Sequence, residues 1–263
     1  MSNAIAWVEQ QWGHPDALGV PVSDRGLGLA DGVFETLLIR AGASQLLESH
    51  LQRWRHGAAW LQLPTPPEQQ QVEQWIVEAI RRSGIGDGAL RINWSRGSGG
   101  RGLQPPAQAM GRCWGSLYPH QPSFQRQKVV ISERVKCWAE DPLNGCKTLG
   151  YGAMVLARLE AIQAGADDAL LRSSQGGLCC GSSANLLIQS NGQWLTPPLS
   201  SGALPGVMRA RGVNLGVIQE APIGEVLSAD QPAVLLNSLD CRPLNAAAEA
   251  LAKPLFEQLL CSL

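Results

Sequence analysis

The order of strand-like and helix-like stretches limits the fold of this chain more than any other feature. Strand-like runs such as 89–95 and 128–135 alternate with amphipathic stretches in both halves of the sequence. The segment 118–123, YPHQPS, separates the halves, and its two prolines among polar residues are typical of a linker. Mixed elements on each side of it predict two α/β domains, residues 1–117 and 124–263.

Amphipathic periodicity predicts where the helices lie. The stretch 49–63 has apolar residues at helical spacing after Ser49, a suitable N-cap. A second helix is expected from Thr65, with prolines in its first turn, to Gly84, which suits a helix end. Further helices are expected at 152–165, 205–213 and 254–263, and further strands at 168–174, 184–190 and 232–239.

The segment WSRGSGGRGL, residues 94–103, is rich in glycine and arginine. Three of its glycines match the G-x-G-x-x-G spacing of a dinucleotide-binding turn: Gly97, Gly99 and Gly102. That turn needs a helix after the last glycine, and Pro105 and Pro106 oppose one. No Gly-Lys-Ser/Thr follows, so a Walker loop is excluded too. Two interpretations remain: a solvated glycine turn, or a flexible loop that presents Arg101, or as second choice Arg96, to a carboxylate.

Composition and charge exclude several classes of partner. A net charge of −1 offers no basic surface for nucleic acid or an acidic membrane. No apolar run approaches the roughly 20 residues of a membrane span, and the first residues lack the pattern of a signal peptide. The seven cysteines form no C-x-x-C pair, which favours a reduced cytoplasmic protein over a disulfide framework. The four histidines form no H-E-x-x-H motif, so no metal site is expected, and the expected partner is a small molecule.

Six segments resemble those of the fold-type IV pyridoxal-phosphate enzymes and occur in that family's order. They are SDRGLGLADGVFETLLIRAG (23–42), ESHLQRW (48–54), GCKTLGY (145–151), GADDALL (165–171), CCGSSANLL (179–187) and LPGVMRARGV (204–213). The string SRGSGGRG (95–102) is characteristic of the 4-amino-4-deoxychorismate lyase branch. The resemblance implies a two-domain α/β fold like that of D-amino acid aminotransferase. It also implies a homodimer, with pyridoxal 5'-phosphate in the cleft between the domains.

The resemblance further implies that Lys147, in the second domain, forms the Schiff base with the cofactor. Lysine is scarce in this chain: only Lys128, Lys136, Lys147 and Lys253 occur. The residues beside Lys147, among them Cys146 and Leu149, are small or apolar and can withdraw the amine from water. Such desolvation lowers the pKa of a lysine and leaves a nucleophilic amine.

Other cofactor contacts are implied in the same way. Arg53 is expected to bind the cofactor phosphate through charge-assisted hydrogen bonds. The remaining phosphate contacts are expected from backbone N–H groups at a helix N-terminus and from one hydroxyl: Gly206, Val207, Met208 and Ser238. Family members carry a glutamate beside the pyridine nitrogen, and this chain has Cys180 at that position.

The activity that the resemblance implies is elimination of pyruvate from 4-amino-4-deoxychorismate, which yields 4-aminobenzoate for folate synthesis. Lys147 would remove the proton at the amine-bearing carbon, and Arg101 would orient a carboxylate. Two alternatives stay open: an aminotransferase acting on branched-chain or D-amino acids, and a binding or regulatory protein that has lost catalysis. Cys180 favours weak transamination, because an uncharged thiol is a poor partner for a protonated pyridine nitrogen.

Overall fold

The computed structural model describes residues 4–261, which divide into two compact units. The first unit extends to Gln121 and includes Cys146–Gly150, and the second comprises Pro122–Gly145 and the chain from Tyr151 onward. The sequence analysis assigned Lys147 to the second domain, whereas its segment packs with the first unit. Within the described range, no helix combines the length and the apolar character that a membrane crossing requires.

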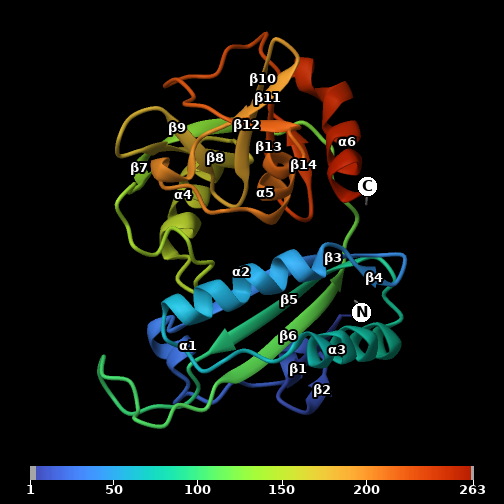
Figure 1. Cartoon of the computed structure of the whole chain (residues 1–263), viewed down its shortest axis with the longest axis vertical. Helices are drawn as coiled ribbons and strands as arrows, with labels where there is room; N and C mark the ends of the chain where they lie inside the picture. Colours follow the sequence, from blue (N-terminus) through green and yellow to red (C-terminus); the bar gives the residue numbers. More distant parts are fainter. Residues whose placement is uncertain (1–3, 262–263) are drawn as a thin grey trace. The chain divides into compact units, whose positions relative to one another are not determined.

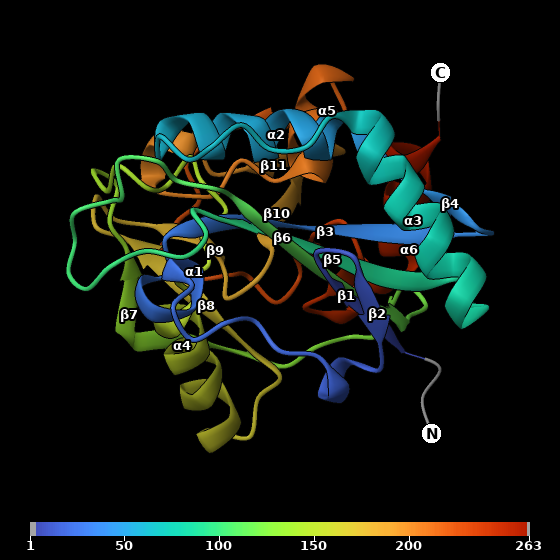
Figure 2. The ribbon, with the colours of Figure 1, turned by 90° about the horizontal axis from the view of Figure 1, so that it is seen from below.

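An antiparallel six-stranded sheet forms the centre of the first unit. The order of its strands is β2 (Gln11–Gly13), β1 (Ile5–Val8), β6 (Arg112–Pro119), β5 (Gly88–Ser95), β3 (Gly32–Arg40) and β4 (Ala43–Ser44). Helices α2 (Leu47–Trp60) and α3 (Gln69–Ser83) pack on this sheet, and the short helix α1 (Arg25–Leu29) lies beside β5 (Figures 1 and 2). One 3-10 turn, η1 (Pro15–Ala17), follows β2.

Alternation along β5 distinguishes the two faces of this sheet. Leu90, Ile92 and Trp94 are buried in the hydrophobic core that α2 and α3 complete. Since successive side chains of a strand point to opposite faces, Arg91 and Asn93 lie on the other face. That face, which the two long helices leave uncovered, carries polar as well as apolar side chains, since Asn93 is flanked by Phe34 of β3 and Trp114 of β6.

The second unit contains a larger mixed sheet. Its strands run in the order β12 (Ile218–Glu220), β11 (Gln193–Thr196), β10 (Asn185–Ser190), β9 (Leu178–Gly181), β8 (Asp168–Ser173) and β7 (Val129–Cys137), and β13 (Ala233–Leu236) joins β10 to β14 (Cys241–Pro243). Helix α4 (Gly152–Gln163) packs on β7 and β8, and α6 (Ala246–Leu260) packs on β13 and β14 (Figure 1). The 3-10 turn η2 (Leu199–Ser201) and helix α5 (Val207–Asn214) lie between β11 and β12 in the chain.

Two helices show how far local signals locate helix ends. Helix α3 ends as predicted, because Gly84 adopts a φ of 70° at its C-cap. Helix α6 begins at Ala246, whereas the sequence analysis placed its start at Pro254. A proline inside a helix costs about 3 kcal/mol, and burial of the helix's apolar face, including Phe256, offsets this cost. Residues 262–263 of the expected helix lie outside the described range.

Candidate active site

The segment that carries Lys147 extends the sheet of the first unit beside the start of β3. The Phe34 N–H donates to the Lys147 carbonyl at 2.9 Å, and the Leu149 N–H donates to the Gly32 carbonyl at 3.0 Å. These bonds place Lys147 opposite Phe34, and the lysine Nζ lies 4.4 Å from the centroid of the phenylalanine ring. Strand-like pairing therefore fixes the backbone of Lys147 and explains why its segment belongs to this unit.

The amine of Lys147 is shifted toward its neutral form. Burial, with smaller contributions from the charges of Arg53 and Arg91, lowers the pKa of Lys147 from 10.5 to about 7, while the charge of Glu35 acts in the opposite direction. A large fraction of the amine is then neutral near pH 7, so it can serve as a nucleophile or a base. The direction agrees with the expectation from its small neighbours, but the sequence analysis did not anticipate the two arginines.

Arg53 is held by a buried carboxylate on β3. Its Nε donates to Glu35 Oε1 at 2.8 Å, and a terminal nitrogen of its guanidinium donates to Oε2 at 2.6 Å. His50 Nδ1 lies 2.7 Å from the same Oε2. Burial alone would raise the pKa of Glu35, but the charge of Arg53 and the hydrogen bonds from Arg53 and His50 lower it to about 2. Burial lowers the pKa of His50, so a neutral imidazole donates to the ionised Glu35.

This arrangement fixes the orientation of the Arg53 guanidinium, since two of its nitrogens contact one carboxylate. The sequence analysis singled out Arg53 alone. Glu35 and His50 both lie in segments that resemble the family. Apart from that, the sequence offered one indication of a role for Glu35, a carboxylate in a mostly apolar strand.

A pocket of about 440 Å³ lies against the face of the first unit's sheet that α2 and α3 leave uncovered, and Arg91, Asn93, Tyr118 and Leu149 are among its lining residues. The Arg91 guanidinium carbon lies 3.6 Å from the Phe34 ring centroid, and its Nε donates to Asn93 Oδ1 at 2.8 Å. The same Phe34 ring therefore contacts both Arg91 and the amine of Lys147. A guanidinium that lines a pocket, as that of Arg91 does, suits recognition of a carboxylate. The sequence analysis assigned Arg91 no role.

Arg96, predicted as the second choice for a substrate carboxylate, is engaged by other groups of the chain. Its Nε and one terminal nitrogen donate to Asp31 at 2.7 and 3.0 Å. Its terminal nitrogens also donate to the carbonyls of Leu61 and Gln62 at 2.8 and 2.7 Å. These contacts occupy a buried guanidinium, which joins the start of the glycine loop to the end of α2.

The glycine loop itself is held by an arginine that the sequence analysis overlooked. Arg25 donates to the carbonyls of Gly102 and Leu103, each at 3.1 Å, and to Asp31 at 2.8 Å. No helix follows Gly102 before β6 begins, in agreement with the rejection of a dinucleotide fold. Arg101 lies exposed in this loop. Of the two arginines predicted to meet a carboxylate, only Arg101 is thus presented to solvent.

In the second unit, Gly206 caps the N-terminus of α5, and Val207 and Met208 form its first turn. A Cβ at Gly206 would lie 2.0 Å from Asn185 Oδ1, so a larger residue there would displace the Asn185 side chain. The Gly206 N–H donates to the Leu204 carbonyl at 2.8 Å, and the first N–H groups of the helix have no acceptor within it. Val207 and Met208 are therefore better placed than Gly206 to bind an anion.

Two further predicted residues lie at other positions in the second unit. Ser238 lies partly buried in the turn after β13, where Asn237 Oδ1 accepts from the Leu239 and Asp240 N–H groups at 2.9 Å. Cys180 lies on β9, paired with Asn185 of β10. The neighbouring thiols and burial raise the pKa of Cys180 well above its usual value, so its thiol is uncharged near neutral pH.

Comparisons with known proteins agree with this architecture. The family model described as amino-transferase class IV matches residues 32–246. A Methanocaldococcus jannaschii protein, provisionally named a branched-chain-amino-acid aminotransferase, is 30% identical over 81% of this chain and 77% of its own. A bifunctional aminodeoxychorismate lyase / D-amino acid transaminase of Mycobacterium tuberculosis is 30% identical over 70% of this chain and 71% of its own. The 4-amino-4-deoxychorismate lyase structure from Pseudomonas aeruginosa is 29% identical, with a TM-score of 0.76 over 97% of this chain and 100% of that one.

Proposed function

The chain belongs to the class IV aminotransferase family, the fold-type IV pyridoxal-phosphate enzymes, and from this premise we propose that it converts 4-amino-4-deoxychorismate to 4-aminobenzoate and pyruvate. The observation that carries the proposal is the amine of Lys147, whose pKa burial lowers to about 7. This amine lies close to Arg91, which lines a small-molecule pocket. A chain that had lost catalysis would have no need for such a desolvated amine.

The donor groups of the chain suit pyridoxal 5'-phosphate. A neutral amine, as at Lys147, can bond to its aldehyde carbon. The helix N-terminus at Val207 and Met208 suits its phosphate, as does the guanidinium of Arg53, which Glu35 keeps oriented. Ser238 can add a hydroxyl. Bound in this way, the cofactor supplies a sink for electrons released at the substrate carbon.

Lys147 acts as the base and acid of the proposed reaction. Its neutral amine removes the proton from the carbon that bears the substrate's amino group. The proton then resides on Nζ, near Phe34, whose ring face can stabilise the resulting cation. Because the pKa of this amine is close to 7, protonating it and deprotonating it near pH 7 cost similar free energies, so it can both accept a proton and return it.

The substrate carries two carboxylates, one retained in 4-aminobenzoate and one that leaves with pyruvate. We propose that Arg91 and the exposed Arg101 each bind one of them. Arg91 lies close to the reacting amine, whereas Arg101 belongs to a loop that Arg25 anchors through backbone carbonyls. Because these hydrogen bonds hold the backbone of the loop in place, the Arg101 side chain can remain exposed to a substrate.

Two observations favour lyase over aminotransferase activity. The string SRGSGGRG, residues 95–102, resembles the corresponding segment of the lyase branch. Cys180, at the position of the family's glutamate, is uncharged and cannot stabilise a protonated pyridine nitrogen. Lyase chemistry tolerates this better than transamination does, since formation of an aromatic ring drives the step. The aminotransferase remains the second candidate, because the relatives include a protein named for both activities.

The direct test measures 4-aminobenzoate by its fluorescence after purified protein is incubated with pyridoxal phosphate and 4-amino-4-deoxychorismate. We expect product from the unaltered protein and from Lys253→Ala, an exposed control, but none from Lys147→Ala. Borohydride reduction and peptide mapping should place the cofactor on Lys147. A cofactor attached to Lys128 or Lys136 would contradict the assignment. Keto-acid-dependent amino transfer faster than 4-aminobenzoate release would establish the aminotransferase instead. Light scattering of the purified protein tests the homodimer, which stays a prediction.

A further inference from the structure

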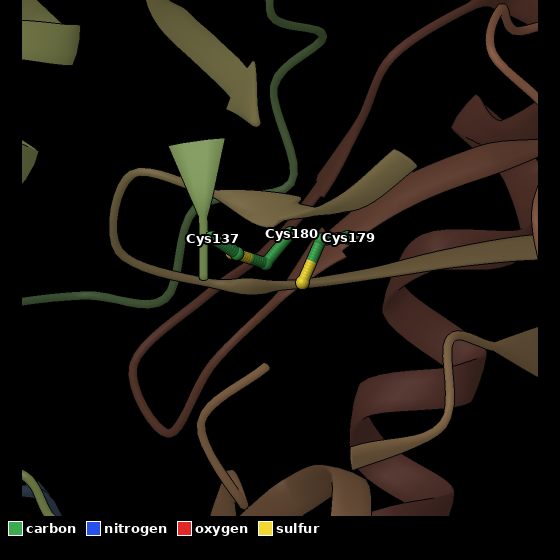
Figure 3. A group of neighbouring side chains, drawn as sticks. All are labelled: Cys137, Cys179 and Cys180. Carbon is green, nitrogen blue, oxygen red and sulfur yellow. The ribbon is translucent and has the colours of Figure 1, made fainter. Parts of the chain in front are cut away.

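Three cysteine thiols meet inside the second unit. Cys137 ends β7, and Cys179 and Cys180 are consecutive residues of β9. Their Sγ atoms all lie within 4.8 Å of one another, and those of Cys137 and Cys180 are 3.4 Å apart (Figure 3). Among residues 4–261, no other three side chains of histidine, cysteine, aspartate or glutamate converge in this way. We call these residues the thiol cluster.

We propose that the thiol cluster binds a thiophilic divalent cation, such as Zn²⁺, through the sulfurs of Cys137, Cys179 and Cys180. Zinc binds thiolate sulfur at about 2.3 Å in tetrahedral geometry, which puts two sulfurs on one ion about 3.8 Å apart. The separations in the cluster, from 3.4 Å to at most 4.8 Å, bracket that value. Small side-chain rotations then suffice to bring all three sulfurs onto one ion.

A disulfide is the competing fate of these thiols, and the strand order opposes it. β8 lies between β7 and β9, with Ser173 paired to Cys137 and Leu171 paired to Cys180. Two strand spacings in a regular sheet amount to about 9–10 Å, whereas the Cα atoms of a disulfide lie about 4.4–6.8 Å apart. Bonding Cys137 to Cys180 would require the strands to move, but a metal ion bridges the gap between their sulfurs.

The surroundings of the thiol cluster suit a closed site with one further ligand. The Ser201 hydroxyl oxygen lies 3.4 Å from Cys179 Sγ and donates to the Pro198 carbonyl at 2.7 Å. Gly202, with a φ of 97°, lets the η2 turn pass close to Cys137, where a Cβ would lie 3.1 Å from that of the cysteine. The Ser201 oxygen, or a water beside it, can complete a four-coordinate site.

Binding releases protons, because each thiol that coordinates the ion is converted to a thiolate. An M²⁺ ion with three thiolates leaves one net negative charge at the site. No electron transfer is involved, so neither an oxidant nor a reductant is needed. The proposal does not rest on the proposed function, although the two share Cys180: with the ion bound, Cys180 is a thiolate ligand, whereas the argument on transamination concerns the metal-free protein, in which its thiol is uncharged.

The test titrates the reduced, chelator-treated full-length protein with Cd²⁺, whose bonds to thiolates absorb in the ultraviolet. We expect this absorption to saturate at one Cd²⁺ per chain, with acidification of a weakly buffered solution. Cys179→Ser and Cys137→Ser should each weaken binding at least about tenfold, because each removes one ligand. Cys241→Ser is the matched control, a buried cysteine of the same unit outside the cluster, and should leave binding unchanged.

X-ray absorption at the cadmium edge of the unaltered protein needs no variant and should give three sulfur neighbours. If the Cys137→Ser/Cys179→Ser double variant still binds one Cd²⁺ per chain with unchanged affinity, the proposal is overturned. Fewer than three sulfurs around the bound ion would overturn it too. A disulfide between Cys137 and Cys180 in the purified protein, found by mass spectrometry before reduction, would overturn it as well.

Discussion

Replacing Lys147 by methionine should stabilise the cofactor-free protein at neutral and acidic pH. Burial lowers the pKa of Lys147 from an ordinary 10.5 to about 7. Each pKa unit corresponds to about 1.4 kcal/mol, so the folded state disfavours the charged amine by about 5 kcal/mol. Methionine has a similar length and no charge, and should relieve most of this cost. The side chain on which the proposed reaction depends is therefore one that opposes folding.

The direction of the pH dependence of stability follows from which state, folded or unfolded, holds the proton on Lys147. Between pH 7 and pH 10.5 the unfolded chain holds a proton on Lys147 and the folded chain does not. The unfolded state then binds more protons, so the free energy of unfolding rises with pH across this window. The advantage of Lys147→Met should be greatest below pH 7, shrink as pH rises, and vanish above pH 10.5.

Urea unfolding of both proteins without cofactor, at several values between pH 6 and pH 10, measures this difference. Other titrating groups are common to both proteins and cancel in the comparison. Lys253→Met, at an exposed position of α6, is the control and should show no pH-dependent gain. A pH-independent difference between Lys147→Met and the unaltered protein would refute the argument that the amine is desolvated.

Four other substitutions separate the roles proposed above. Arg101→Ala should lower kcat/KM roughly ten- to a hundredfold by removing a carboxylate contact, with cofactor affinity unchanged in an absorbance titration. Arg53→Ala should weaken cofactor affinity first, because it removes a phosphate contact. Loss of cofactor in Arg101→Ala but not in Arg53→Ala would show that the two roles are exchanged. Arg96→Ala removes hydrogen bonds to Asp31 and to two carbonyls at the end of α2, while Arg25 still pairs with Asp31, and should cost about 1–3 kcal/mol in urea unfolding; a pure KM effect would contradict this. Cys180→Glu should increase keto-acid-dependent transamination, and efficient transamination by the unaltered protein would count against that reasoning.

The arginines of the first unit show the limit of local reasoning. Arg91, Arg96 and Arg101 lie close together in the sequence, and each has the same guanidinium chemistry. Their surroundings differ: Arg96 contacts Asp31 and the end of α2, Arg101 is exposed, and Arg91 lines the pocket beside Phe34. The partners that decide each role are distant in the chain, so no spacing in the sequence could rank the three.

The thiol cluster could not be predicted from the sequence either, because its residues are distant in the chain. Cys137 lies more than 40 residues before Cys179 and Cys180, with no C-x-x-C pair to mark a site. Only the placement of β7 and β9 on either side of β8 brings the sulfurs together. The expectation of no metal site rested on motif spacing, which cannot detect the ligands of the proposed site, because separate strands supply them.

The sequence by itself determined the features whose causes are local or recur as motifs. Alternating strands and amphipathic stretches established the α/β class, Gly84 ended α3, and six short segments identified the family. Only the tertiary structure decided that Lys147 belongs with the first unit, that Glu35 orients Arg53, and that Asp31 holds Arg96. The physical reason is that propensity and capping act within a few residues, whereas burial, ion pairing and pKa depend on groups that the fold brings together.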